Sequence, residues 1–203
     1  MTRLYLVRHG ETTWNDEQRF QGHIDVPLNA RGWRDAERLA TRFADERVDA
    51  IYTSDLRRAF DTAEVIAREL RKTKICEPRL REANMGELQG MVYADVRARW
   101  FSDVPTMPCY FVDDAPPGVE CLRALQTRLL EAVNDLVVRH ANETILIVNH
   151  GAGLRVLFCA WLNMPLEDYW KLQFDSASVS QVVLTERGAV VALLNDTAHL
   201  HNL

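Results

Sequence analysis

The chain has 203 residues, of which 47% are hydrophobic and 26% are charged, as in an ordinary soluble globular protein. Its 24 lysines and arginines against 29 aspartates and glutamates give a net charge of −5, which argues against nucleic acid or an anionic membrane as a partner, because both attract basic surfaces. No apolar run approaches the ~20 residues that cross a bilayer, so we expect no membrane-spanning helix.

The beginning of the chain predicts two strands and two helices. Residues 4–7 form an apolar run typical of a buried strand, whereas residues 12–29 show no clear period and are predicted as loop. Asn29 is predicted to cap a helix that follows it. Residues 50–53 predict the second strand, which leads into a helix over about 56–70.

The middle of the chain is less regular. Residues 74–76 are predicted as a third strand, 80–90 as a loop and 93–100 as a helix. Residues 102–118 contain several prolines, and a long irregular segment inside a compact domain is usually a lid or a substrate loop. We therefore expect a lid over about residues 91–120.

The last part of the chain has stronger patterns. Apolar residues at helical spacing predict an amphipathic helix over 122–136, and residues 144–148 form the clearest buried strand. A helix is expected over 154–162. The apolar runs 179–184 and 189–194, separated by a short turn, are typical of a β-hairpin.

Strands that alternate with helices predict an α/β fold: a three-layer α/β/α sandwich with a mostly parallel central sheet and an irregular lid segment. We expect residues 1–203 to form a single domain. In such sheets, ligands bind beyond the carboxyl ends of the strands, so the chemistry is expected there.

The four cysteines are expected to be buried free thiols, because they form no C-x-x-C pair and match no zinc spacing. They are Cys76, Cys109, Cys121 and Cys159. The N-terminus runs directly into a strand without a long apolar signal region. A reducing, cytoplasmic location is therefore expected.

Two histidines directly follow predicted strands. His9 lies beyond the strand 4–7, and His150 lies beyond the strand 144–148. Each is followed by glycine, which lets the backbone turn sharply and lets a ligand approach closely. If the two strands are neighbours in the sheet, the two imidazoles meet at one edge.

Charged side chains are predicted to join the histidines. Arg8 precedes the first histidine, Arg57 and Arg58 open the helix after the second strand, and Glu82 lies in the loop 80–90. Guanidinium groups can hold phosphoryl oxygens, and a neutral imidazole can attack phosphorus. The positive charge of Arg8 favours the neutral form of the neighbouring imidazole. A carboxylic acid can protonate the departing alkoxide and then take a proton from water. These residue types predict a phosphoryl-transfer site.

Five blocks in this order resemble the histidine phosphatase superfamily, also called the phosphoglycerate-mutase-like family. The first block reads L-V-R-H-G-E-T over residues 6–12 and is followed by W-N. The others lie at residues 21–32, 54–62, 80–90 and 149–151, and a tail at 195–200 is similar to that of many bacterial phosphatases. The resemblance covers nearly the whole chain.

The resemblance implies a role for each matching position. His9 would be the phosphorylated nucleophile and Glu82 the proton donor. The groups that hold the phosphoryl oxygens would be Arg8, Arg58 and His150, and the substrate-binding positions would be Asn15, Gln21 and Gly22. The positions outside the motifs are expected to be surface or packing groups: Arg57, His23, His140, His199 and His201.

The resemblance also implies a histidine acid-type phosphatase that acts on a small-molecule phosphate ester without a metal ion or another cofactor. Candidate substrates are α-ribazole phosphate, phosphorylated sugars or sugar acids, and small phosphomonoesters in general. A homodimer stays open.

Two positions depart from the family pattern. Met85 stands where an aromatic residue is common, which alters the packing near the substrate. Residues 118–121 read G-V-E-C where Gly-Glu-Ser or a similar run is frequent, so the contacts of the lid are left open.

Three activities fit the resemblance: a phosphatase, a phosphoglycerate mutase, and a non-catalytic phosphate-binding or scaffold relative. Mutases of the family usually carry a longer insertion with extra basic residues that bind a carboxylate. Residues 102–118 contain no lysine or arginine and carry Asp103, Asp113 and Asp114. The sequence therefore favours the phosphatase, and the presence of every catalytic position disfavours the scaffold.

Overall fold

The computed structural model describes residues 1–100 and 111–201. In this part of the chain a single sheet has the strand order β3-β2-β4-β1-β5-β6. Its strands are β1 (Thr2–Arg8), β2 (Ala50–Thr53), β3 (Lys74–Cys76), β4 (Thr144–Asn149), β5 (Val179–Thr185) and β6 (Gly188–Asp196). The strands β3, β2, β4 and β1 are parallel, whereas β5 is antiparallel to β1 and β6 is antiparallel to β5.

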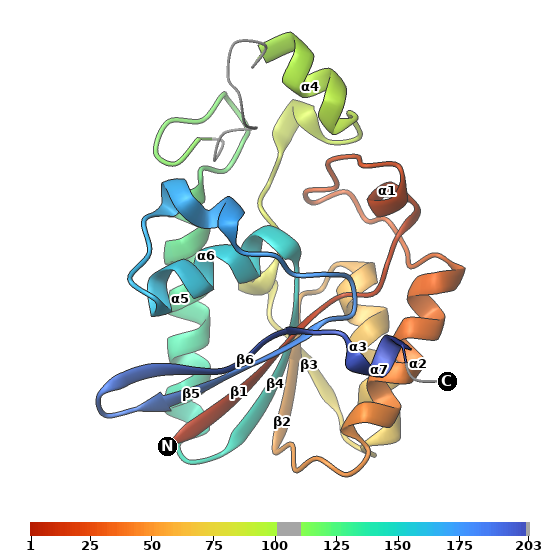
Figure 1. Cartoon of the computed structure of the whole chain (residues 1–203), viewed down its shortest axis with the longest axis vertical. Coiled ribbons are helices and arrows are strands. Elements are labelled where there is room, and N and C mark those ends of the chain that lie inside the picture. Colours follow the sequence, from red (N-terminus) through yellow and green to blue (C-terminus); the bar gives the residue numbers. More distant parts are fainter. Residues whose placement is uncertain (101–110, 202–203) are drawn as a thin grey trace.

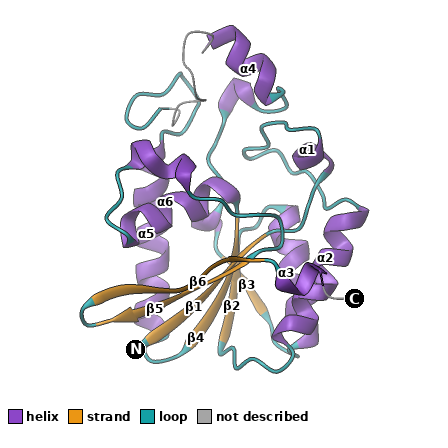
Figure 2. Ribbon diagram, in the orientation of Figure 1, coloured by secondary structure: helices purple, strands orange, loops and turns teal. Residues whose placement is uncertain are grey.

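Helices cover both faces of the sheet, which confirms the predicted α/β/α sandwich (Figure 1). The α-helices are α1 (Thr13–Asp16), α2 (Ala30–Phe43), α3 (Arg57–Glu69), α4 (Tyr93–Trp100), α5 (Leu122–Arg139), α6 (Gly151–Trp161) and α7 (Ala198–His201). Short 3₁₀-helices are η1 (Pro78–Leu80), η2 (Gly86–Leu88) and η3 (Leu166–Lys171). Figure 2 shows α2 and α3 on one side of the sheet and α5 and α6 on the other.

The alternation of side chains along β1 explains why two helical layers form. Leu4 and Leu6 belong to the apolar cluster shared with α5 and α6, whereas Tyr5 and Val7 belong to the cluster shared with α2 and α3. Successive residues of a strand point to opposite faces, so an unbroken apolar run must be covered on both. Full burial of each such side chain stabilises the fold by about 1.5–3 kcal/mol.

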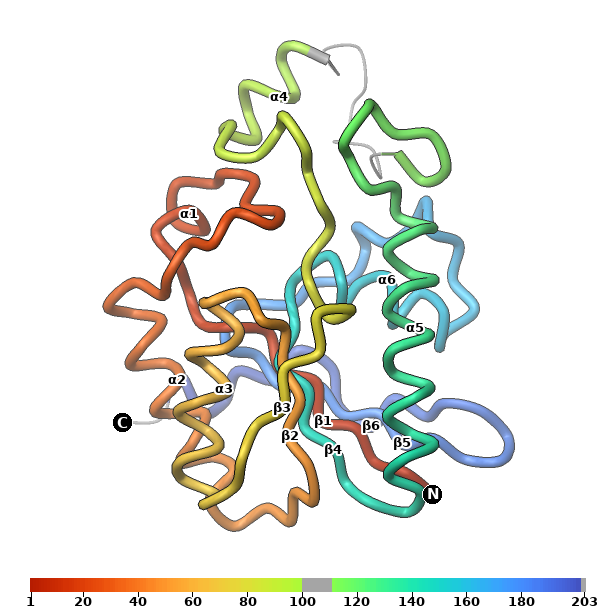
Figure 3. The backbone as a smooth tube through the Cα atoms, turned by 180° about the vertical axis from the view of Figure 1, so that it is seen from behind, coloured from red at the N-terminus to blue at the C-terminus, as the bar shows by residue number. Residues whose placement is uncertain are grey.

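The carboxyl ends of the parallel strands point toward the part of the molecule that holds α1 and α4. Figure 3 shows these two helices above that edge of the sheet, far from the N-terminus. The predicted helix 93–100 corresponds to α4. The remainder of the predicted lid is described only from residue 111 onward, and Asp103 and Cys109 lie outside the described residues.

Several elements differ from the expectations, including the 3₁₀-helix η2 inside the predicted loop 80–90. The predicted loop 12–29 contains the short helix α1, which a capping box between Thr12 and Asn15 stabilises. Helix α6 begins at Gly151, three residues before the predicted start, and η3 had no clear sequence signal. The hairpin formed by β5 and β6 and the cap that Asn29 gives α2 are confirmed.

The expectation that the cysteines are buried is wrong for Cys76, which is exposed, and holds only in part for Cys121. Cys76 ends a three-residue strand at the edge of the sheet, where one side of the backbone has no neighbouring strand. Cys159 is buried, and all three described cysteines are free thiols. None of the described helices has the length and apolar character needed to cross a membrane.

Candidate active site

The two predicted histidines meet at the carboxyl ends of neighbouring strands. The register of β1 and β4 pairs Arg8 with Asn149, so His9 and His150 follow the strands at the same level. The backbone N–H of His9 donates to the carbonyl of Asn149 at 3.0 Å. The ring centroids lie 5.1 Å apart with an angle of 60° between the ring planes, and both residues are buried.

The hydrogen bond of His9 fixes which ring nitrogen carries its proton. Nδ1 lies 2.7 Å from the carbonyl oxygen of Gly10, which can only accept, so in the neutral ring Nδ1 carries the hydrogen and donates it. The lone pair is then on Nε2. Burial, and after it the charges of Arg58 and Arg8, hold the pKa of His9 well below its usual value, so the ring is neutral near pH 7.

Close backbone packing positions His9. A Cβ added to Gly10 would lie 2.6 Å from the carbonyl oxygen of Gly32 at the start of α2. The N–H of Gly10 donates to the hydroxyl of Thr62 at 3.0 Å, and this hydroxyl donates to the carbonyl of Arg58 at 2.7 Å. The loop after β1 is therefore attached to both α2 and α3.

Arg58 enters the site from the first turn of α3 and is only 1% exposed. Its terminal nitrogens donate to the carbonyls of Ile24, at 3.0 Å, and Gly22, at 2.8 Å, while Nε has no partner within residues 1–100 and 111–201. Burial lowers its pKa to about 10, which leaves the guanidinium charged at neutral pH. Arg57, by contrast, lies at the surface beside Asp61.

Several buried nitrogens at the site lack a partner among the residues that the structure describes. Arg8 donates from Nη1 to the carbonyl of Phe174 at 2.6 Å, but its Nε is unpaired, as are both ring nitrogens of His150. Buried polar groups are nearly always paired, so unpaired groups that converge indicate a ligand position. With the charges of Arg8 and Arg58, these groups are suited to an anion with several oxygens.

The side chain of Glu82 lies at the N-terminus of α6, the helix that begins directly after His150. Its carboxylate accepts hydrogen bonds from the backbone N–H groups of Ala152 at 3.1 Å, Gly153 at 3.2 Å and Ala83 at 3.0 Å. The carboxylate therefore caps the first turn of α6, and its charge acts on both Arg8 and Arg58.

The three predicted substrate-binding residues line the same cleft, whose volume is about 1170 Å³. The side-chain oxygen of Asn15 is used by the N–H and hydroxyl of Thr12, which leaves its amide nitrogen as a donor. Gln21 is buried, and its side-chain oxygen has no partner in the described part of the chain. Gly22 has φ +53°, a conformation that favours glycine, and directs its carbonyl to Arg58.

Arg155 and Tyr93 are among the cleft residues that were not identified from the sequence. Arg155 lies one turn after Gly151 on α6, and its guanidinium lies 5.7 Å from the ring of Tyr169. Its Nε is buried and has no partner among the residues described by the structure. Tyr93 begins α4 and lines the cleft, and burial raises the pKa of its hydroxyl. The i to i+4 relation of Arg155 to Gly151 would have indicated its position, had the start of α6 been predicted correctly.

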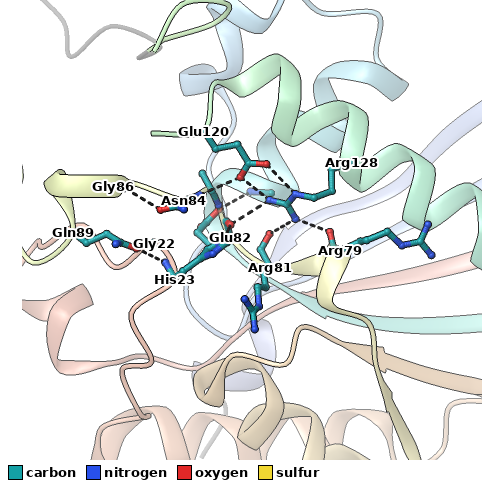
Figure 4. A network of polar contacts seen from close by, with 12 residues as sticks. Gly22, His23, Arg79, Arg81, Glu82, Asn84, Gly86, Gln89, Glu120 and Arg128 are labelled. Atoms are coloured by element: carbon teal, nitrogen blue, oxygen red, sulfur yellow. Dashed lines mark hydrogen bonds and ion pairs between the residues drawn. The ribbon is translucent and has the colours of Figure 1, made fainter. Parts of the chain in front are cut away.

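A second polar network supports the loop that carries Glu82. Figure 4 shows Arg128 of α5 between the carboxylate of Glu120 and the backbone of this loop. On the other side of the loop, the ring Nε2 of His23 lies 2.8 Å from the carbonyl oxygen of Glu82. No cluster of His, Cys, Asp or Glu suited to a metal ion occurs among the residues that the structure describes.

The chain is similar to known proteins in sequence and in fold. A model of the histidine phosphatase superfamily (branch 1) matches residues 4–197. Phosphoserine phosphatase 1 of Hydrogenobacter thermophilus is 33% identical to this chain, and the match covers 98% of this chain and 95% of that protein. The probable phosphoglycerate mutase GpmB of Proteus mirabilis is also 33% identical, and the match covers 100% of this chain and 97% of that protein. The solved structure of Bacillus stearothermophilus YhfR superposes with a TM-score of 0.89 at 35% identity, covering 98% of this chain and 100% of that one.

Proposed function

The chain belongs to the histidine phosphatase superfamily (branch 1), and from this premise we propose that it is a histidine acid-type phosphatase that hydrolyses small phosphate monoesters through a phosphohistidine on His9. The observation that carries the proposal is the state of His9. Its ring is neutral, holds its proton on Nδ1, and lies beside two charged guanidinium groups.

In the first half of the reaction, the lone pair of His9 Nε2 forms a bond to phosphorus while the bond from phosphorus to the ester oxygen breaks. The carboxylic acid of Glu82 gives its proton to the departing alkoxide, which leaves as an alcohol. The charge on the phosphoryl oxygens is stabilised by Arg8, Arg58 and His150, each of which has a buried side-chain nitrogen without a partner among the described residues.

In the second half, water attacks phosphorus and gives a proton to the carboxylate of Glu82. The bond from phosphorus to Nε2 breaks, inorganic phosphate leaves, and His9 is neutral again. The donors at α6 are suited to this carboxylate state, because three backbone N–H groups point at the Glu82 oxygens. Asn15 would contribute a further donor to the phosphoryl group, and Gln21 and Gly22 would face the substrate.

The preference for hydrolysis over mutase activity rests on the composition of residues 102–118, which contain three aspartates and no lysine or arginine. Asp113, one of the described acidic residues of the lid, is paired with Arg123, so neither side chain is available as a clamp for a carboxylate. A mutase must retain a doubly anionic acid between its two half-reactions. The phosphoserine phosphatase among the relatives agrees with the hydrolase, whereas the mutase relative keeps phosphoglycerate mutase as the alternative.

The purified protein should be assayed against a panel of phosphate esters, with interconversion of phosphoglycerates measured in parallel. A phosphatase releases inorganic phosphate from esters of the panel. Interconversion without net phosphate release would replace the proposal by the mutase, and no turnover in either assay would favour a binding or scaffold protein.

A further inference from the structure

Arg128 makes an unusually complete set of hydrogen bonds. From α5, its Nε donates to Oε1 of Glu120 at 2.9 Å and its Nη2 donates to Oε2 at 2.7 Å, which is a bidentate pair. Its Nη1 also donates to the carbonyls of Arg79 at 2.7 Å and Arg81 at 3.0 Å, and its Nη2 reaches the carbonyl of Glu82 at 3.3 Å. One guanidinium thus contacts the backbone on both sides of the proposed proton donor.

The backbone of Glu82 is held from two directions. Arg128 donates to its carbonyl from the side of α5, and His23 donates to the same oxygen at 2.8 Å from the loop after β1. The backbone N–H of His23 in turn donates a hydrogen bond to the side-chain oxygen of Gln89 at 2.6 Å. The carboxylate of Glu82 then reaches the start of α6 from a backbone with little freedom to move (Figure 4).

Glu120 connects this arrangement to the segment before α5. Its backbone N–H donates to the carbonyl of Asn84 at 2.7 Å, and its Oε2 accepts from the N–H of Asn84 at 3.1 Å. The Glu120 side chain is only 18% exposed and that of Arg128 only 24%, so the pair is partly shielded from water. A single carboxylate therefore orients the guanidinium and also fixes the chain two residues beyond Glu82.

We propose that Arg128, oriented by Glu120, is a positioning residue for proton donation by Glu82. It fixes the carbonyls around Glu82, so that the carboxyl group stays within reach of the leaving oxygen while phosphorus is bonded to His9. The inference rests on the proposed function. It requires arginine, because a planar guanidinium can bind a carboxylate and several carbonyls at once, whereas the ammonium of lysine is a compact charge with three donors.

The test uses leaving groups that need a proton to different degrees. Arg128→Gln, Arg128→Lys and Glu82→Gln are compared with the wild type on p-nitrophenyl phosphate and on the aliphatic ester of the panel that the wild type hydrolyses fastest. p-Nitrophenolate leaves without protonation, whereas an aliphatic alkoxide does not. A displaced donor should lower kcat/KM for the aliphatic ester by about 100-fold and for p-nitrophenyl phosphate by no more than about threefold.

Arg123→Gln is the matched control. Arg123 lies on the same helix and is also paired with a carboxylate, that of Asp113, but makes no contact with the loop of Glu82. This variant should leave both rates within about twofold of the wild type, as is usual for surface positions. Equal losses on both esters in Arg128→Gln would overturn the inference, because they would indicate a general structural defect.

Glu120→Gln keeps the proposal open to test if Arg128→Gln does not fold, which circular dichroism would reveal. Glutamine retains the shape but not the charge of the partner, and the same leaving-group dependence should appear in a weaker form. Its absence in folded Glu120→Gln also overturns the inference. If Glu82→Gln shows the leaving-group dependence and the Arg128 and Glu120 variants do not, only this inference fails. A wild-type protein that hydrolyses none of the esters would instead contradict the proposed function itself.

Discussion

At the scale of single residues, the site depends on the protonation state of His9. Its ring is neutral because burial and two guanidinium groups disfavour the imidazolium, and its Nδ1 proton is committed to the carbonyl of Gly10. The proposed role of this ring as a nucleophile therefore depends on its burial and on its contact with Gly10, neither of which the sequence shows.

The first prediction concerns this nucleophile. His9→Ala should abolish phosphate release and the acid-labile phosphoryl label on the protein, while leaving the fold intact, because within the described residues the ring is hydrogen-bonded only to its neighbour Gly10. Label and turnover are measured with a radioactive ester, and the fold is checked by circular dichroism. Phosphate release at the wild-type rate by this variant would remove His9 from the reaction.

The second prediction concerns Arg155 of the cleft, whose buried Nε has no partner among the described residues, and it takes as test ester phosphoserine, the substrate in the name of one relative. A second anionic group on the substrate would find this guanidinium, so Arg155→Gln should raise the KM for phosphoserine by about tenfold, which corresponds to roughly 1.4 kcal/mol. The KM for phosphoethanolamine, which lacks the carboxylate, is the internal control and should stay unchanged. Parallel changes for the two esters would contradict this role of Arg155.

At the scale of elements, the strands and most helices follow from local patterns, because β4 and β1 are apolar runs and α5 is strongly amphipathic. The start of α6 does not follow, since its cap is the carboxylate of Glu82, about 70 positions earlier in the chain. The error of three residues also hid the face of α6 that carries Arg155. Helix α1 was missed because four residues show no period.

The candidate site was predictable to the extent that it lies at strand ends. His9, His150 and Arg58 come together as expected from the parallel order of β2, β4 and β1. The supporting pairs Glu120–Arg128 and Thr62–Gly10 were not expected as interactions, because each joins segments whose distance in space is set by the tertiary fold alone.

The third prediction concerns the contact of two elements, the loop after β1 and the first turn of α2. A Cβ on Gly32 would collide with the carbonyl oxygen of Glu11, which belongs to the backbone and cannot rotate away. Gly32→Ala should therefore lower the free energy of unfolding by about 1–3 kcal/mol and also reduce kcat. Urea denaturation measures the free energy of unfolding, and Glu37→Ala on the exposed side of α2 is the control. Equal stability of the two variants would contradict the collision.

At the scale of the whole molecule, two buried imidazoles make stability depend on pH. The pKa values of His9 and His150 are held well below the usual value of about 6.5, mainly by burial. Below that pH the unfolded chain binds protons that the folded chain does not, so folding becomes less favourable as the pH falls. The contribution is complete above about pH 7 and is lost progressively on acidification.

The fourth prediction follows from this linkage. Thermal unfolding temperatures should fall between pH 7 and pH 5, and each imidazole should contribute up to about 1.4 kcal/mol for each pH unit. In His150→Asn, which has one fewer buried imidazole, the fall should be less steep. Differential scanning calorimetry across this range decides the matter, and identical slopes for wild type and variant would assign the pH dependence to other groups.

The parallel register of β1 and β4 has a consequence for how the chain can vary. The backbone pairing of the two strands, rather than any bond between their side chains, sets the distance between two rings that lie 141 positions apart in the sequence. Loss of a single residue within β4 would shift its end by about 3.3 Å and turn the following ring to the opposite face of the sheet. The connecting loops can therefore gain or lose residues without separating the two rings. Within β1 and β4, only substitutions leave the rings together.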